Sequence, residues 1–138
     1  MKKQLFALVG LGLLLATASA SAQTVALKAN IPFNFIVNKA ELPAGEYSLS
    51  NLGTTGMVTL IQSTDRQVAK MVLPNACTSV HPSEKTRLVF HRYGDRYFLA
   101  QVWTAGSNQG RELPKSSRET EIALDYPVQN VILDATLR

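Results

Sequence analysis

The sequence predicts an all-β protein, a single-domain β-sandwich or small β-barrel with one short helix near its C-terminus. Three observations support this fold class. Apolar residues alternate with polar or small ones through most of the chain after residue 23, turn-forming Pro, Gly, Asn and Asp recur at short intervals, and one stretch alone, near Ser116, has helical spacing. Many short strands separated by regular turn signals are typical of sandwiches and barrels.

Residues 1–22 have the three parts of a secretory signal peptide. Lys2 and Lys3 form a basic start, and residues 5–16 (LFALVGLGLLLA) form an uncharged apolar run. This run is too short to cross a bilayer, which needs about 20 apolar residues. Ala20–Ala22 then fits the small-residue pattern that signal peptidase recognises, and we expect cleavage after Ala22.

Residues 23–138 are therefore expected to form one exported β-rich domain, in the periplasm or outside the cell, with no membrane span. Lys2 and Lys3 account for half of the formal net charge of +4, so the mature chain is close to neutral. Its basic residues are not clustered, whereas nucleic-acid binding leaves a basic patch. We expect no nucleic-acid partner.

The first half of this domain is predicted to contain several strands. Alternation begins with Val25, Leu27, Ala29 and Ile31 and continues beyond Pro32 with Phe33, Phe35 and Val37. Proline cannot donate to a strand ladder, so Pro32 predicts an edge strand, a bulge or a break. A turn at 42–45 (LPAG) leads to a strand that places Tyr47 and Leu49 on one face.

The next segment predicts a hairpin. Residues 51–56 (NLGTTG) have loop composition, and the β-branched run at 57–61 has strand length. A turn at 63–66 separates this run from a returning strand at 68–73.

A second hairpin is predicted between Arg87 and Thr104, with its two-residue turn at Gly94–Asp95. This turn would pair Tyr93 with Arg96, His91 with Phe98 and Phe90 with Leu99. One face would carry Leu88, Phe90, Leu99 and Trp103, and the other Val89, His91, Phe98 and Val102. Because both faces are largely apolar, we expect a central hairpin covered on both sides.

The C-terminal part predicts a loop at 105–110, a short helix and a last strand. Ser116 and Glu119 have capping-box spacing, Pro127 ends any helix, and residues 128–137 follow as one strand. The acidic residues of this region are interleaved with Arg and Lys, which predicts a solvated charged face; they are Glu112, Glu119, Glu121 and Asp125.

The sequence identifies no catalytic residue, metal site or cofactor. His81 is expected in a loop and His91 in mid-strand as a packed or partly exposed side chain, and one Cys with one His is too few for a zinc site. Cys77 is the only cysteine, so it cannot form an internal disulfide. It is expected to be a small buried side chain at a strand end, and the alternatives are a disulfide-linked dimer through Cys77 and a reactive thiol.

Four residues are candidate contacts to an unknown ligand or protein partner: Tyr93, Asp95, Tyr97 and Trp103. Exposed aromatic rings could stack on sugars or apolar ligands, whereas buried ones would belong to the core, which the composition favours. Asp95, between two arginines, is expected to be an exposed turn residue.

Two stretches are similar to those of a protein family: residues 31–47, with IPFNF and LPAGEY, and residues 90–114 (FHRYGDRYFLAQVWTAGSNQGRELP). They resemble a family of short uncharacterised secreted proteins from soil-dwelling Gram-negative bacteria. The resemblance implies an exported single-domain protein, and it implies no activity and no site residues.

Taken together, the sequence favours an exported non-enzymatic β-domain, a binding or structural module of the cell envelope. The alternative is a small secreted or periplasmic hydrolase that uses His91 or His81 as a base with a nearby carboxylate. A small outer-membrane barrel ranks last, because eight strands of about 9–11 residues would leave few residues for loops.

Overall fold

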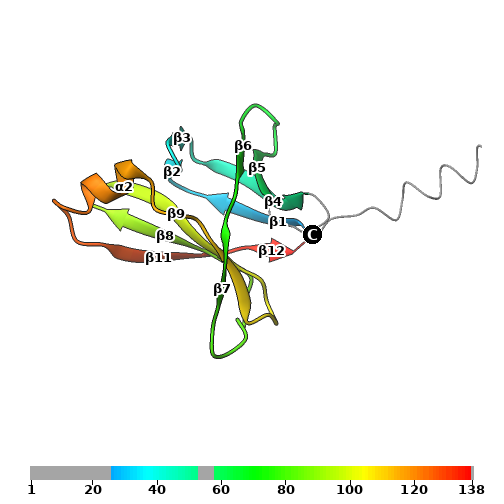
Figure 1. Cartoon of the computed structure of the whole chain (residues 1–138). Coiled ribbons are helices and arrows are strands. Elements are labelled where there is room, and N and C mark those ends of the chain that lie inside the picture. Colours follow the sequence, from blue (N-terminus) through cyan, green and yellow to red (C-terminus); the bar gives the residue numbers. More distant parts are fainter. Residues whose placement is uncertain (1–25, 53–57, 138) are drawn as a thin grey trace, which may run out of the picture.

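The computed structural model describes residues 26–52 and 58–137. The predicted signal peptide, Val25, Met57 and most of the predicted loop at 51–56 lie outside these residues. Within them, two β-sheets pack face to face and one short helix lies on the outer side of the second sheet (Figure 1). The all-β prediction is confirmed, and of the two architectures that it left open the structure has the sandwich.

The first sheet has five strands in the order β12-β1-β4-β5-β6, and all its pairs are antiparallel. Its strands are β1 (Ala26–Ile31), β4 (Gly45–Leu52), β5 (Val58–Ser63), β6 (Ala69–Val72) and β12 (Thr136–Leu137). The β5–β6 pair is the hairpin predicted at 57–73. Arg66 has a φ of 62° in its turn.

The second sheet has the order β11-β8-β9-β10-β7, and β2 and β3 join it through β9. Its strands are β2 (Phe35–Val37), β3 (Ala40–Leu42), β7 (Asn75–Thr78), β8 (Arg87–Tyr93), β9 (Arg96–Trp103), β10 (Gln109–Glu112) and β11 (Gln129–Asp134). β2 runs parallel to the first half of β9, and β10 runs antiparallel to its second half.

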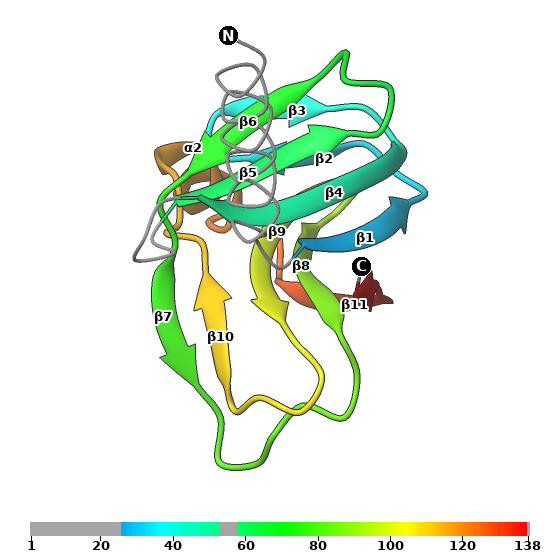
Figure 2. The ribbon, with the colours of Figure 1, turned by 90° about the vertical axis from the view of Figure 1, so that its right-hand side faces the viewer.

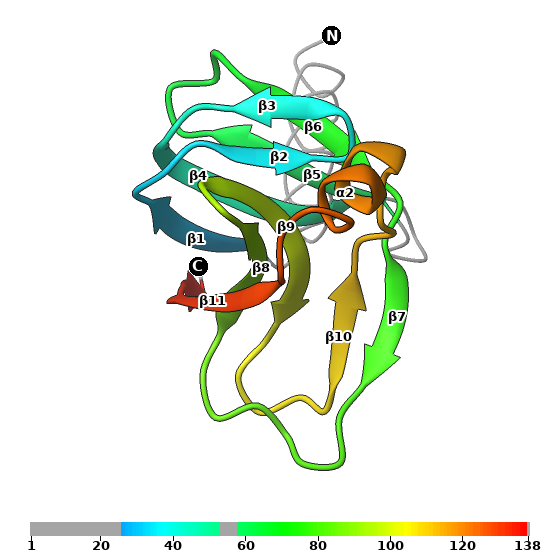
Figure 3. The same ribbon diagram turned by 90° about the vertical axis from the view of Figure 1, so that its left-hand side faces the viewer.

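The strands of the two sheets cross rather than run side by side, as Figure 2 shows for β4, β5 and β6 against β7 and β10. Crossed packing is typical of sandwiches whose strands pass from one sheet into the other. From the opposite side, Figure 3 shows the helix α2 (Ser117–Ile122) beside β9 and β2. The helix therefore covers part of the outer face of the second sheet.

The inner faces of both sheets form one core, as the alternation predicts. Leu27, Ala29 and Ile31 of β1 are buried, and so are Tyr47 and Leu49 of β4. They pack with residues of the second sheet, which are Phe35, Val37, Leu42, Leu88, Phe90 and Leu99.

The chain passes between the two sheets at four short links: residues 32–34, 43–44, 73–74 and 135. Three of these links contain a proline, at positions 32, 43 and 74. Proline has no N–H to donate and so ends a ladder at the point where the chain leaves its sheet. Of the three outcomes predicted for Pro32, the structure has the break.

The hairpin β8–β9 has the predicted turn and pairing. Tyr93 lies opposite Arg96, His91 opposite Phe98 and Phe90 opposite Leu99. The hairpin is central in its sheet, with the core on one side and α2 on the other.

The predicted faces of this hairpin are wrong beyond Leu99. The register shifts between Val89 and Phe90, so that Ala100 is an extra residue in β9. A bulge moves all later side chains to the other face. Val102 therefore packs against the core, and Trp103 lies on the outer face with Gly110 as its partner in β10.

The last predicted strand is two strands in the structure. β11 pairs with β8 in the second sheet, and β12 pairs with β1 in the first sheet. Between them, the N–H of Ala135 donates to the carbonyl of Thr86 at 2.8 Å. The predicted segment is extended throughout, and the change of sheet at Ala135 has no turn signal in the sequence.

Substitution Gly110→Ala is expected to destabilise the fold by about 1–3 kcal/mol, as overpacking does. A Cβ at Gly110 would lie 2.8 Å from ring carbons of Trp103, which is closer than such atoms approach. Urea unfolding measures the change, with the exposed neighbour Gln109→Ala as control, expected to stay within about 0.5 kcal/mol of the parent. Equal midpoints for the two variants would contradict the close packing.

Candidate functional site

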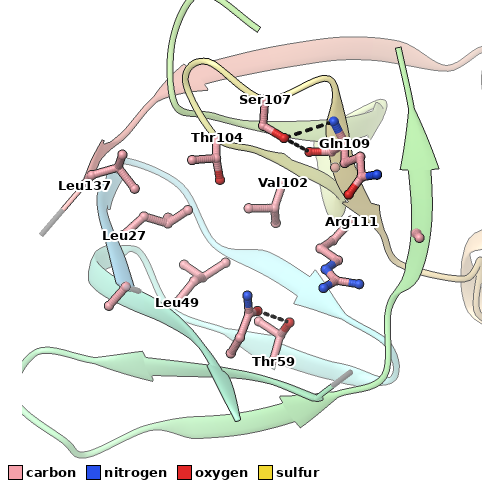
Figure 4. Close-up of a pocket in the computed structure, with 13 residues that line it drawn as sticks. Leu27, Leu49, Thr59, Val102, Thr104, Ser107, Gln109, Arg111 and Leu137 are labelled. Atoms are coloured by element: carbon pink, nitrogen blue, oxygen red, sulfur yellow. Dashed lines mark hydrogen bonds between the residues drawn. The ribbon is translucent and has the colours of Figure 1, made fainter. Parts of the chain in front are cut away.

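A pocket of about 240 Å3 opens between the two sheets at one end of the sandwich (Figure 4). Two other hollows are more open to solvent: one at the tip of the β8–β9 hairpin and one beside His81. Both sheets contribute to the wall of the pocket, which consists of Ala26, Leu27, Leu49, Asn51, Thr59, Ala76, Val102, Thr104, Ser107, Gln109, Gly110, Arg111 and Leu137.

The first sheet supplies most of the apolar wall. Leu27 and Leu49 are opposite each other in β1 and β4, and their side chains point inward because of the strand alternation. Leu137 of β12 lies opposite Leu27 and extends this surface (Figure 4). On the same sheet, the hydroxyl of Thr59 donates to Asn51 Oδ1 at 3.4 Å, which places two polar groups beside the leucines.

The second sheet supplies the polar rim through the turn between β9 and β10. The N–H of Gly106 donates to the carbonyl of Ser83 at 2.8 Å, which ties this turn to a neighbouring loop. Ser107 Oγ donates to the carbonyl of Gln109 at 3.2 Å and accepts from its N–H at 3.1 Å (Figure 4). These bonds hold the rim in one conformation.

The pocket wall is chemically mixed. It combines leucine and valine side chains with hydroxyls, amides and the half-buried Arg111, and it includes no His, Asp or Glu. Ligand sites in proteins typically have this combination of apolar surface and a few polar groups. A hydroxyl needs an adjacent base to act as a nucleophile, and none lines this pocket.

The predicted contact residues do not gather in this pocket. Asp95 and Tyr97 line a hollow of about 400 Å3 at the hairpin tip, where the Tyr97 ring stacks on Phe33 at 3.8 Å. Trp103 lines another hollow, of about 310 Å3, together with His81. Tyr93 is buried under α2.

The helix α2 has the predicted N-cap at Ser116, but among the described residues the reciprocal half of the capping box is missing, because the Glu119 carboxylate binds Tyr93 and His91 instead. Ser116 precedes the helix in an extended conformation, and its Oγ accepts from the N–H of Glu119 at 3.2 Å. Ile122 packs against Ile36, Tyr93 and Phe98 on the outer face of the second sheet. The helix therefore begins where the sequence predicts, and one of its faces is covered by the sheet.

The prediction of a fully solvated acidic face is wrong for Glu119, which is 5% exposed. Its Oε2 accepts from Tyr93 Oη at 2.8 Å and from His91 Nδ1 at 2.9 Å. A buried carboxylate is retained only where hydrogen bonds replace its water. This cluster of Glu119, His91 and Tyr93 fastens the helix to the sheet.

Cys77 lies in β7 opposite Gly110 and is partly buried. Burial and, to a smaller extent, the negative charge of Glu112 raise the pKa of its thiol. A raised pKa lowers the fraction of reactive thiolate at neutral pH. The disulfide-linked dimer through Cys77 stays a prediction.

Among residues 26–52 and 58–137, no three His, Cys, Asp or Glu side chains lie close enough to hold a metal ion. No helix in the part of the chain that the structure describes is long and apolar enough to cross a membrane.

Comparison with known proteins gives no family for this chain. A scan against protein-family models finds no match, and searches of the curated proteins and of the solved structures find none. The family resemblance of residues 31–47 and 90–114 stays a prediction.

Sequence reasoning missed the pocket and its charged residue Arg111. The segment at 105–110 is predicted as a loop, but β10 begins at Gln109. Gly110, Arg111 and Glu112 show no apolar alternation, because Gly110 accommodates the Trp103 ring instead of contributing a side chain. The cross-strand register alone shows that Arg111 lies opposite Val102, on the inner face.

Tyr93 is expected to titrate at about 12. Burial, followed by the hydrogen bond to Glu119 and its negative charge, raises the pKa of Tyr93 to this value. An unfolded tyrosine titrates near 10, so Tyr93 stabilises the fold fully below about pH 10 and loses this contribution between about pH 10 and 12. Tyrosinate absorbance, with Tyr93→Phe identifying the signal, measures the titration.

Glu119→Gln serves as the matched variant for this titration. The Tyr93 pKa should fall without reaching 10, because burial, the largest single cause of the raised value, persists in the variant. An unchanged Tyr93 pKa in Glu119→Gln would show that the two side chains do not interact in solution.

Proposed function

We propose that this protein is an exported, non-enzymatic binding module that takes a small ligand into the pocket between its two sheets. The pocket itself is the observation that supports this function. It has walls from both sheets, an apolar surface beside polar groups, and a rim held by hydrogen bonds. Such pre-formed pockets with a few directed polar groups are typical of small-molecule sites.

The cellular location in this proposal is inferred from the sequence. The basic start, apolar run and small-residue cleavage pattern of residues 1–22 support export to the periplasm or beyond. A role at the cell envelope fits a compact β scaffold whose loops and edges are exposed. The alternative within the same class is a module that contacts another protein or serves structurally.

Thermal unfolding of purified residues 23–138 against glycans, lipids and small metabolites tests the proposal. A ligand at a hundredfold excess over its dissociation constant stabilises the folded state by about 2.7 kcal/mol. We expect at least one class to raise the melting temperature, and Thr104→Trp, which fills the pocket from its rim, to abolish that rise.

Thr64→Trp is the control, because Thr64 is exposed in the turn between β5 and β6 and does not line the pocket. It should retain the ligand-induced rise. No rise with any class, or equal rises in the parent and Thr104→Trp, would contradict pocket binding. The first result would favour a protein partner or a structural role.

One observation favours a second candidate, the hydrolase. His91 Nδ1 is hydrogen-bonded to Glu119, and a carboxylate in that position orients a histidine so that its Nε2 can act as a base. No hydrogen bond joins a Ser, Thr or Cys side chain to His91 among the described residues, and His91 is absent from the wall of the pocket. A hydrolase would therefore need His91 to activate water directly.

His91→Gln separates the two candidates. A general base contributes typically 10²–10⁴-fold to the rate, so a His91-dependent hydrolase should lose at least a hundredfold of its activity on ester, amide or glycoside substrates. The binding module predicts no hydrolysis that depends on His91. His81→Gln is the control, and circular dichroism verifies that each variant folds.

A further inference from the structure

Arg111 lies on the inner face of the second sheet. It lies opposite Val102 in β9 and opposite Ala76 in β7, and Val102 packs against the core. Directly opposite residues share a face of the sheet, so the Arg111 side chain starts on the core side. Figure 4 shows it extending from β10 across the pocket toward Thr59 of the first sheet.

The charge of Arg111 is not balanced by the wall around it. The pocket wall contains no Asp or Glu. Within the described part of the chain, the ion pairs are Lys28–Glu46, Lys85–Asp134 and His91–Glu119, and none of them involves Arg111. Glu112 follows it in the strand, but consecutive strand residues point to opposite faces. A half-buried guanidinium in this position attracts an anion.

The polar groups near Arg111 can complete an anion site. Thr59 and Asn51 lie on the facing sheet, and Ser107 and Gln109 lie on the rim above it. The amide N–H groups of Asn51 and Gln109 can donate hydrogen bonds to carboxylate or phosphate oxygens, and the guanidinium can donate two parallel ones. The hydroxyls of Thr59 and Ser107 already donate to Asn51 Oδ1 and to the Gln109 carbonyl, so each would have to turn to face an anion. The leucines at 27, 49 and 137 lie on the other side of the same cavity.

We infer that the ligand is a small amphiphile, with an anionic oxygen group held by Arg111 and a short apolar body against the leucines. This inference rests on the proposed function and specifies its ligand class. The cavity sets the size of the enclosed part of the ligand, because about 240 Å3 holds about eight water-sized groups at ~30 Å3 each, and any longer part would extend from the open end of the pocket. Carboxylates and phosphate esters share the required chemistry.

Four probes with the same eight-carbon chain test the inference: octanoate, octyl phosphate, octanol and octyltrimethylammonium. Binding to residues 23–138 is measured by amide chemical-shift titration and by the melting temperature. We expect octanoate or octyl phosphate to bind at least tenfold more tightly than octanol, and the cation to bind most weakly. The preference between the two anions identifies the head group.

Arg111→Gln should weaken anion binding by about tenfold or more and leave octanol binding unchanged, since a charge-assisted hydrogen bond is lost. Arg111→Lys should be intermediate, because a lysine cannot form the two parallel bonds of a guanidinium. Arg96→Gln, at the exposed hairpin tip and outside the pocket wall, is the matched control and should bind like the parent.

The possible failures are distinguishable. Octanol binding as tightly as octanoate in the parent chain would overturn the anion inference and leave the binding module intact, and this comparison needs no variant to fold. An anion preference that persists in Arg111→Gln would overturn the role of Arg111. Absence of binding by all four probes, together with no thermal shift by any ligand class, would overturn the proposed function itself.

Discussion

The four short links between the two sheets are the constraint on which the rest of the structure depends. Residues 32–34, 43–44, 73–74 and 135 each join a strand of one sheet to a strand of the other. Three extended residues span about 10 Å, which is also the spacing of packed sheets. The sheets therefore cannot separate without breaking a ladder at one end of a link. The shared core follows directly, since Ile31 and Phe35 flank the first link and both are buried.

The same links place the walls of the pocket. The link at 73–74 leads into β7, whose Ala76 lines the second-sheet side, and the link at Ala135 leads into β12, whose Leu137 lines the first-sheet side. Because the links are short, they limit how far these walls can move apart. Binding to a pre-formed cavity has a smaller free-energy cost than binding to a cavity that the ligand must first open. This rigidity is the physical reason to relate the pocket to binding.

Local patterns predicted the parts of this fold that depend on local physics. Strand alternation identified Leu27, Tyr47 and Leu49 as inward residues, and Gly94–Asp95 set the pairing of the central hairpin as far as Leu99. Contacts between distant residues had no local signal. The capping box predicted where α2 begins, but the burial of Glu119 depends on His91 and Tyr93, which lie 28 and 26 positions away. The pocket could not be predicted for the same reason, because its wall combines residues from strands that are far apart in the sequence.

Glu119 of α2 and Arg111 of β10 lie on opposite sides of the second sheet, and their surroundings differ. Glu119 is almost completely buried, and both its partners belong to the same protein, so its cost of desolvation is offset within the fold. Arg111 is half-buried in a wall without carboxylates, and within the described residues it forms no ion pair. A purely structural position on an inner face favours an apolar residue, because burial of a guanidinium has a desolvation cost that burial of an apolar side chain does not. A charge at that position is consistent with the proposed anionic ligand, which would stabilise the guanidinium from solution.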